Sequence, residues 1–268
     1  RSPRRALRLC LIGLMRAAKW VVGKNAPTPQ SDGVLKPLLK QSRISVRFEL
    51  FSRKGYGMIN SLLDTDFYKL TMMQVVLHQY ASAWVRYTFK WRNWDEMHLT
   101  VPLQDFKGKV DAEIDRLCEL RFSEDEVRYL SSIRFFKPDF IEYLRLFQLN
   151  RSYIRTAIEA DQLKINIEGP WLNTILYEIP VLAIISELYS NLHGVNSDVW
   201  MQDGRKRLKD KIRFLNGAEI ADKRFQFAEF GTRRRASYSW QEEVLRYLIQ
   251  NCGENLVGTS NVHFAMKL

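Results

Sequence analysis

Two segments of this chain alternate between apolar and polar side chains, which is the pattern of a strand with one buried face. They are residues 85–91 and residues 163–167. Two further short apolar strands are predicted at residues 225–230 and 256–258. Because helical patterns separate these strands along the chain, the sequence favours an α/β or α+β fold.

Local start signals place several of the helices. Ser123 and Glu126 have the spacing of a capping box, in which each side chain binds the backbone N–H of the other residue. Pro138 suits the first position of the next helix. Ser239 and Glu242 repeat the capping spacing before a helix that we expect to end near residue 250. Further helices are predicted at residues 110–120 and 198–215.

A long apolar segment spans residues 171–192 and is interrupted by Asn173, Glu178 and Glu187. These polar residues make the segment too polar for a membrane span, so we predict a helix buried in the core. Pro180 is expected to kink this helix, because proline removes a backbone hydrogen bond and crowds the preceding turn.

The net charge of +11 lies entirely in residues 1–57, which contain thirteen Lys or Arg and only two acidic residues, Asp32 and Glu49. The remaining 211 residues carry 28 basic and 28 acidic side chains, so the body of the protein is neutral. A role in binding nucleic acid would therefore depend on the N-terminal segment alone.

Three interpretations of residues 1–57 remain open. The segment is a transit-like or membrane-surface segment, since residues 5–22 are mildly amphipathic, or it is an arm that binds nucleic acid. Alternatively, it is translated sequence upstream of a true start at Met58. We favour this last interpretation, because the globular pattern begins just after Met58 and residues 25–33 have the composition of a linker.

Cysteine and histidine give no support to disulfide or metal chemistry. Cys10, Cys118 and Cys252 are far apart and form no Cys-x-x-Cys pair, and the four histidines are scattered. This pattern predicts reduced thiols in a cytoplasmic protein and no metal site built from side chains alone.

Three polar segments are candidates for the functional site, and the first is residues 61–70. We expect Asp64 to be the N-cap of a helix and Asp66 to lie in its first turn, near the positive end of the helix dipole. Tyr68 and Lys69 then point away from the apolar face of that helix. An aromatic ring and a cation in this position suit an anionic aromatic ligand.

The second segment begins where the strand at 225–230 ends. Gly231 is expected to permit an unusual turn, and a run of three arginines that includes Arg233 and Arg235 follows. Ligands of α/β proteins bind at the carboxyl ends of strands, and arginine binds phosphate and carboxylate groups with bidentate geometry. The segment therefore predicts an anion site.

The third segment is a small turn of hydroxyl and amide side chains after the strand at 256–258. Gly258 is expected to let backbone N–H groups approach a ligand, and Thr259, Ser260 and Asn261 offer short hydrogen-bonding groups.

Taken together, Asp-Thr-Asp-x-Tyr-Lys, Phe-Gly-Thr-Arg-Arg-Arg and Val-Gly-Thr-Ser-Asn, in this order and spacing, resemble the motifs of nicotinate phosphoribosyltransferases. The resemblance covers residues 58–268 and none of residues 1–57. It implies an enzyme that joins nicotinate to phosphoribosyl pyrophosphate and releases pyrophosphate and nicotinate mononucleotide for NAD synthesis. It also implies coupled ATP hydrolysis through a transient phosphohistidine, Mg²⁺ carried by the substrate, and a head-to-tail homodimer with shared active sites.

The fold implied by this resemblance is an irregular α/β barrel of the type II phosphoribosyltransferase kind beside an open-faced α/β sandwich. Residues 58–170 would form the N-terminal helical and sandwich domain. Residues 171–268 would form the first part of the barrel, which would be incomplete.

The resemblance also assigns roles to residues of this chain. Phe230 and Tyr68 of the partner subunit would hold the pyridine ring between them. Arg233 would bind the anionic part of the ligand, and Arg235 is a weaker candidate for the same role.

The remaining candidate residues surround the substrate. Asp66 and Lys69 would shape the phosphate end of the site, and Thr259 and Asn261 would add hydrogen bonds. Ser260 bears on the choice of pyridine, because the related nicotinamide enzymes resemble this chain but carry Asp at the corresponding position. A serine adds no negative charge and can donate to a carboxylate, which favours nicotinate over nicotinamide or another pyridine.

No catalytic residue is assigned within this chain. The family continues after the Asn261 segment with a helix and a Gly-Thr-x-Ala-His-Glu segment that carries the phosphorylated histidine, whereas this sequence stops at Leu268. His263 lies only two residues after Asn261 and is not expected to be that histidine. We expect the chain alone to be inactive and its cut barrel to expose apolar surface.

Overall fold

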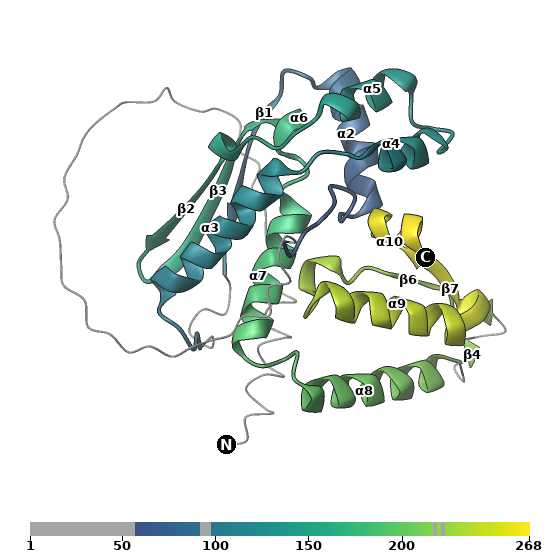
Figure 1. The fold of residues 1–268 in the computed structure, drawn as a ribbon. Helices are drawn as coiled ribbons and strands as arrows, with labels where there is room; N and C mark the ends of the chain where they lie inside the picture. Colours follow the sequence, from purple (N-terminus) through teal and green to yellow (C-terminus); the bar gives the residue numbers. More distant parts are fainter. Residues whose placement is uncertain (1–56, 92–97, 217–218, 221–222) are drawn as a thin grey trace.

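The computed structural model describes residues 57–91, 98–216, 219–220 and 223–268. The predicted basic segment at residues 1–57 therefore lies outside the described residues, apart from Gly57. In Figure 1 a small sheet lies on one side of the molecule and a second group of helices and short strands lies on the other. Helix α7 (Glu178–Leu192) runs between these two parts.

An antiparallel sheet brings the two predicted alternating strands together. It contains β1 (Trp84–Phe89), β2 (Ile154–Glu159) and β3 (Gln162–Pro170) in the order β1-β3-β2. Every second residue of β3 is buried, which confirms the strand predicted from alternation. Trp91 lies beyond the end of β1, but its side chain is still buried.

Helices cover one face of this sheet and extend beyond it. Helix α3 (Leu103–Glu119) begins seven residues before the predicted helix and packs along the sheet (Figure 1). Helix α4 (Glu124–Ser131) begins with the predicted capping box, in which both bonds between Ser123 and Glu126 are present. Helix α5 (Pro138–Leu146) starts at the predicted proline. These local start signals were sufficient because each acts within a few residues of chain.

The long apolar segment forms two helices with a break between them. Helix α6 (Trp171–Thr174) ends after one turn, and three residues separate it from the start of α7. Pro180 is the third residue of α7, and the break at residues 175–177 lies directly before it, so the predicted interruption is present but falls before the proline rather than at it. In the first turn of a helix a backbone N–H has no intrahelical partner, so proline fits there without bending the helix.

Helix α7 is buried along almost its whole length. The stretch Trp171–Leu192 is long and apolar enough to cross a membrane, but 89% of its most apolar window is buried inside the protein. It therefore behaves as the predicted core helix. The principal hydrophobic core extends from Ile59 to Tyr189 in sequence, with Val262 added, so the predicted domain boundary at residue 170 divides this core.

The second part of the molecule follows α7 in sequence. Helix α8 (Asp198–Asn216) matches the predicted charged helix; Ile212 is its buried residue, and Leu208 is partly buried beside it. The short strands β4 (Glu219–Ile220) and β5 (Lys223–Arg224) pair with each other. A separate small core lies between α8 and helix α9 (Tyr238–Cys252), around Ile212, Leu248 and Cys252.

The predicted strands at 225–230 and 256–258 form a parallel pair. They are β6 (Phe227–Glu229) and β7 (Leu256–Thr259), linked by α9, and α10 (Val262–Lys267) follows β7. Two parallel strands joined through a helix are a unit of an α/β barrel, but the strands of the described residues form no closed barrel.

The cap of α9 differs from the sequence prediction. Ser237, not Ser239, is the N-cap, and its side chain accepts a hydrogen bond from the backbone N–H of Trp240. Both serines lie in one short polar run, so the spacing to Glu242 alone did not decide between them.

We predict that Gly169→Ala destabilises the protein by about 1–3 kcal/mol, the usual effect of overpacking a core. A Cβ atom at this position would lie 2.8 Å from Cδ1 of Tyr153 and 3.0 Å from Cγ2 of Thr174. Gly108→Ala is the matched control, since a Cβ at this helical position meets nothing within 4 Å and should stabilise α3 by about 0.5–1 kcal/mol. Urea unfolding of both variants measures the difference, and equal midpoints would contradict the packing of β3.

Candidate active site

The first and third polar segments lie against each other. The backbone N–H of Phe67 donates to the carbonyl of Ser260 over 2.7 Å, and the N–H of Val262 donates to the carbonyl of Thr65 over 3.0 Å. Helix α2 (Phe67–Gln79) therefore starts beside the end of β7. Segments almost 200 residues apart in sequence form one wall of a site.

Glu229 connects the second segment to this wall. The N–H of Ser260 donates to the backbone carbonyl of Glu229 over 2.9 Å, and Oγ1 of Thr259 donates to its carboxylate over 2.7 Å. The same carboxylate accepts the N–H of Gly231 over 2.5 Å. All three predicted segments therefore meet at the carboxyl ends of β6 and β7, where ligands of α/β folds bind.

The two glycines of these turns have different roles from each other. Gly258 has φ +149, a region in which side chains are strained, and it lies at the irregularity where β6 pairs with β7. The unusual turn predicted at Gly231 is wrong, because its φ is −88 and any residue adopts this conformation. Space matters more there, since a Cβ would lie 2.4 Å from Oε1 of Glu229 and would displace this carboxylate from its contacts.

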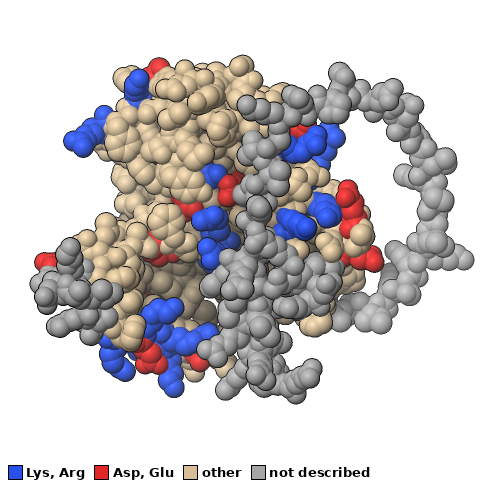
Figure 2. All heavy atoms as spheres, turned by 180° about the vertical axis from the view of Figure 1, so that it is seen from behind, with Lys and Arg blue, Asp and Glu red and all other residues tan. Residues whose placement is uncertain are grey.

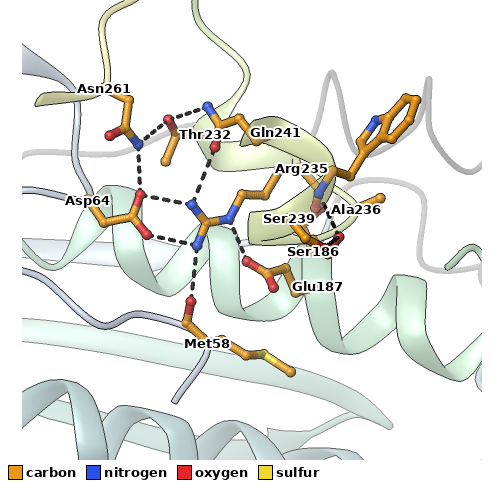
Figure 3. A network of polar contacts seen from close by, with 12 residues as sticks. Met58, Asp64, Ser186, Glu187, Thr232, Arg235, Ala236, Ser239, Gln241 and Asn261 are labelled. Carbon is orange, nitrogen blue, oxygen red and sulfur yellow. Dashed lines mark hydrogen bonds and ion pairs between the residues drawn. The ribbon is translucent and has the colours of Figure 1, made fainter. Parts of the chain in front are cut away.

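Arg235 lies at the centre of a buried network (Figure 3). Its Nε donates to Glu187 over 2.5 Å, and its Nη1 and Nη2 atoms each lie 2.8 Å from an oxygen of Asp64. Further bonds reach the backbone carbonyl of Met58 and the side chain of Gln241. The guanidinium thus joins the start of the described chain to α7 and α9.

Asn261 extends this network. Its Nδ2 donates to Asp64 over 2.7 Å and to the hydroxyl of Thr232 over 2.9 Å, while its Oδ1 accepts the N–H of Phe264 (Figure 3). Gln241 also donates to Thr232, over 3.0 Å. Asn261 is therefore the N-cap of α10 and a link between all three segments.

Two of the predicted substrate-binding residues, Arg235 and Asn261, are buried in this network. The side chain of Arg235 is 1% exposed and Asn261 is fully buried, and their polar atoms bind other groups of the protein. In this structure both side chains hold the three polar segments together. The hydroxyl of Thr259 is also engaged, because it donates to Glu229 and accepts the N–H of Asn261.

A second group of charges lies next to this network and consists of Asp66, Lys69, Glu178 and Arg233. Lys69 is buried and forms an ion pair with Glu178. Arg233 lies 3.6 Å from Asp66 and 3.9 Å from Glu178, measured between the nearest charged atoms. When all four side chains are ionised, the two acids and two bases of this group have no net charge. Arg233 is the base of the group that is exposed enough to contact an anionic ligand.

Asp66, not Asp64, occupies the N-cap position of α2, and its side chain makes no capping bond. Its Oδ1 instead accepts the hydroxyl of Ser260 over 2.6 Å. Burial raises the pKa of Asp66 above its ordinary value, against the opposing effects of the Ser260 hydrogen bond and of Arg233. The predicted cap at Asp64 is wrong because that carboxylate is used by Arg235 and Asn261.

Arg233 is the most accessible member of this second group. Its side chain is 28% exposed, whereas those of Lys69 and Glu178 are 5% and 10% exposed. Nε of Arg233 and Oδ2 of Asp66 are both buried atoms without a hydrogen-bond partner in the described part of the protein. The two atoms lie 3.6 Å apart and form an ion pair that is too long for a hydrogen bond, so Arg233 keeps donor capacity for an incoming acceptor.

The two predicted aromatic residues are both partly exposed. Tyr68 lies in the electric field of Glu178, Arg233 and Asp66 of its own chain, and burial raises its pKa to about 12, so the phenol stays neutral. Phe230 is 51% exposed and directly follows β6. Its ring borders a cavity of about 410 Å³ between α8 and α9, which Arg234 also lines.

Two functional carboxylates were missed as site residues. Glu178 and Glu187 were read only as polar interruptions of an apolar helix. A carboxylate inside a buried helix requires a cationic partner, and this signal would have pointed to buried Lys or Arg elsewhere in the chain. The sequence still did not say which cation pairs with which acid.

The described residues contain no group of three His, Cys, Asp or Glu side chains arranged to hold a metal ion. His263 is hydrogen-bonded through Nε2 to the hydroxyl of Tyr238 over 2.9 Å, and burial lowers its pKa. It lies on α10, on the side of the chain that faces α9.

Comparisons with known proteins agree with this geometry. Residues 63–186 match the family model described as the nicotinate phosphoribosyltransferase N-terminal domain, and residues 225–268 match the model of the nicotinate phosphoribosyltransferase family. Enzymes of that name from Cupriavidus necator and Xylella fastidiosa are each 48% identical, over 210 and 211 residues. Each alignment covers 77% of this chain and 51% of the relative, so the chain spans about half the length of the curated relatives it matches.

Solved structures give the same result. The crystal structure of nicotinate phosphoribosyltransferase from Porphyromonas gingivalis has a TM-score of 0.67 and 31% identity, covering 78% of this chain and 51% of that one. The structure from Vibrio cholerae has a TM-score of 0.65 and 32% identity, covering 79% and 49%. The fold is therefore that of a type II phosphoribosyltransferase. Within that class, the chain belongs to the nicotinate phosphoribosyltransferase family.

We predict that Arg235→Met destabilises the protein by about 3–5 kcal/mol, because it leaves Asp64 and Glu187 buried without their cation. Arg128→Met is the control, since Arg128 pairs with Asp125 on the surface and both side chains are more than 70% exposed. That exposed pair should contribute no more than about 1 kcal/mol. Chemical denaturation measures both, and a small loss for Arg235→Met would show that the network is not structural.

Glu187 should make stability depend on pH. One guanidinium faces two carboxylates, and burial raises the pKa of Glu187 from 4.5 to about 7. A raised acid pKa means that the folded state keeps a proton that the unfolded chain releases. The resulting stabilisation is present below pH 4.5 and is lost as pH rises through about 7. We predict that the wild type loses stability relative to Glu187→Gln across this window, whereas parallel unfolding curves at all pH values would contradict the assignment.

Proposed function

We propose that this chain is part of an enzyme that joins nicotinate to the ribose of phosphoribosyl pyrophosphate, giving nicotinate mononucleotide and pyrophosphate. Membership of the family supports the reaction. The observation that carries the proposal is Arg233, a partly exposed guanidinium at the carboxyl end of β6 whose contacts to Asp66 and Glu178, at 3.6 and 3.9 Å, are too long for hydrogen bonds. A guanidinium so placed suits the carboxylate of nicotinate.

The chemistry requires positioning rather than a nucleophilic side chain. The ring nitrogen of nicotinate attacks the ribose carbon, the bond to pyrophosphate breaks, and positive charge develops on the ribose. Arg233 would hold the carboxylate, and the exposed face of Phe230 would stack on the ring and set its plane. Ser260 would complete the recognition of the ring substituent.

Several further features belong to the same proposal. The coupling to ATP hydrolysis, the Mg²⁺ carried by the pyrophosphate, and a cytoplasmic homodimer in which Tyr68 of the partner subunit covers the ring follow from the family resemblance. Lys69 and Glu178 would keep Asp66 and Arg233 in place at the edge of the site. We assign no side chain of this chain to the metal.

We predict that Arg233→Met weakens the binding of nicotinate to the purified chain by roughly 10- to 100-fold, the loss of one charge-assisted hydrogen bond of about 1.5–3 kcal/mol. Binding of uncharged nicotinamide should change much less. Arg128→Met is the control, because Arg128 pairs with Asp125 on the surface of α4 and takes no part in the proposed site. Isothermal titration calorimetry measures each affinity, and equal losses in the two variants would argue against Arg233 as the anion-binding residue.

A further inference from the structure

The hydroxyl of Ser260 has one hydrogen atom, and this hydrogen is already used. Oγ of Ser260 donates to Oδ1 of Asp66 over 2.6 Å, and both backbone groups of Ser260 are bonded, to Glu229 and Phe67. Ser260 is 7% exposed and Asp66 is 1% exposed. A ligand that contacts Oγ of Ser260 therefore meets the lone pairs of this oxygen, because its hydrogen points toward Asp66.

This direction decides which pyridine the serine can bind. A hydroxyl that donates to a carboxylate offers only lone pairs to a ligand. Lone pairs accept the N–H of an amide, as in nicotinamide, but repel the carboxylate of nicotinate. The presence of serine at position 260 therefore does not by itself select nicotinate.

We propose that Asp66 selects the pyridine by setting the direction of the Ser260 hydroxyl. When Asp66 carries a proton, it donates to Oγ of Ser260, and the serine hydrogen turns toward the carboxylate of nicotinate. When Asp66 is ionised, the hydroxyl turns back and the site prefers an amide. Asp66 is thus a positioning residue that acts through Ser260, and this inference rests on the proposed function.

The surroundings of Asp66 favour its protonated form, because they raise the pKa of its carboxyl group. Its neighbours are Ser260 after β7, Arg233 and Arg234 on the turn after β6, Glu178 at the start of α7, and Tyr68 and Lys69 on its own helix. Burial and Glu178 raise the pKa of Asp66, whereas Ser260, Arg233 and Lys69 lower it, and the net direction is upward. Engagement of Arg233 by a bound carboxylate would weaken its hold on Asp66 and raise that pKa further.

Proton balance gives the proposal a direct signature. Nicotinate binding takes up one proton from solvent, which ends on Asp66, and no proton is lost elsewhere. The affinity for nicotinate should therefore fall as pH rises above the pKa of Asp66, by up to about tenfold per pH unit for one linked proton. The affinity for nicotinamide should not fall in this range, because the ionised form of Asp66 suits it.

The test is titration calorimetry of the purified chain with nicotinate and with nicotinamide, from slightly acidic to slightly alkaline pH, in buffers of different ionisation enthalpy. Asp66→Asn is the informative variant, because the amide of Asn donates permanently to Ser260 and imitates protonated Asp66. We expect it to bind nicotinate with the low-pH affinity of the wild type at every pH, without proton uptake, and to bind nicotinamide more weakly. Asp105→Asn, an exposed change at the start of α3, should keep the wild-type pH profile.

Ser260→Ala separates this mechanism from a general effect of charge. With the hydroxyl removed, the change at Asp66 should no longer alter the preference between the two pyridines. Nicotinate binding without proton uptake in the wild type, or an Asp66→Asn variant with an unchanged pH profile, would overturn the inference and leave the proposed function standing. Failure of the wild type to bind either pyridine at millimolar concentration would overturn the proposed function itself, and the inference with it.

Discussion

The buried guanidinium of Arg235 is the contact on which the rest of the site depends. The side chain extends from the turn after β6 and binds Asp64 of the first polar segment and Glu187 of the core helix α7. An arginine buried to this degree is stable only with carboxylate partners and filled hydrogen bonds. The contacts of Arg235 therefore fix three parts of the chain relative to one another: the first polar segment, α7 and the turn after β6. Asn261, bonded to Asp64 and Thr232, adds the fourth attachment.

The buried network around Arg235 explains why two nearby arginines, and likewise two nearby aspartates, have different roles. Arg235 is fixed in the interior, whereas Arg233, two positions earlier, keeps a partly exposed side chain beside Asp66. The two aspartates repeat the pattern, because Asp64 binds the structural arginine and Asp66 faces Ser260. A rigid inner layer thus positions an outer layer whose polar groups are incompletely satisfied. A binding site requires these two layers, because an arginine that contacts a ligand must be positioned by its neighbours and still have free hydrogen-bond donors.

Sequence reasoning was most successful where a signal acts over a few residues. The capping box at Ser123 and the start of α5 at Pro138 were confirmed, and alternation identified β1 and β3. It was wrong where a distant group competes for the same side chain. Asp64 has the composition of an N-cap, but Arg235, 171 residues away, takes its carboxylate.

By itself, the sequence determined the mixed helix and strand pattern, the neutrality of the body, and the three polar segments that mark the family. These features depend on residue type and spacing along the chain, which the sequence states directly. Only the tertiary structure decided which arginine is buried, which aspartate faces the serine, and which carboxylates of α7 neutralise them. The reason is physical: the free energy of a charged group depends on its desolvation and on partners brought close by folding, and neither can be read from its neighbours in sequence.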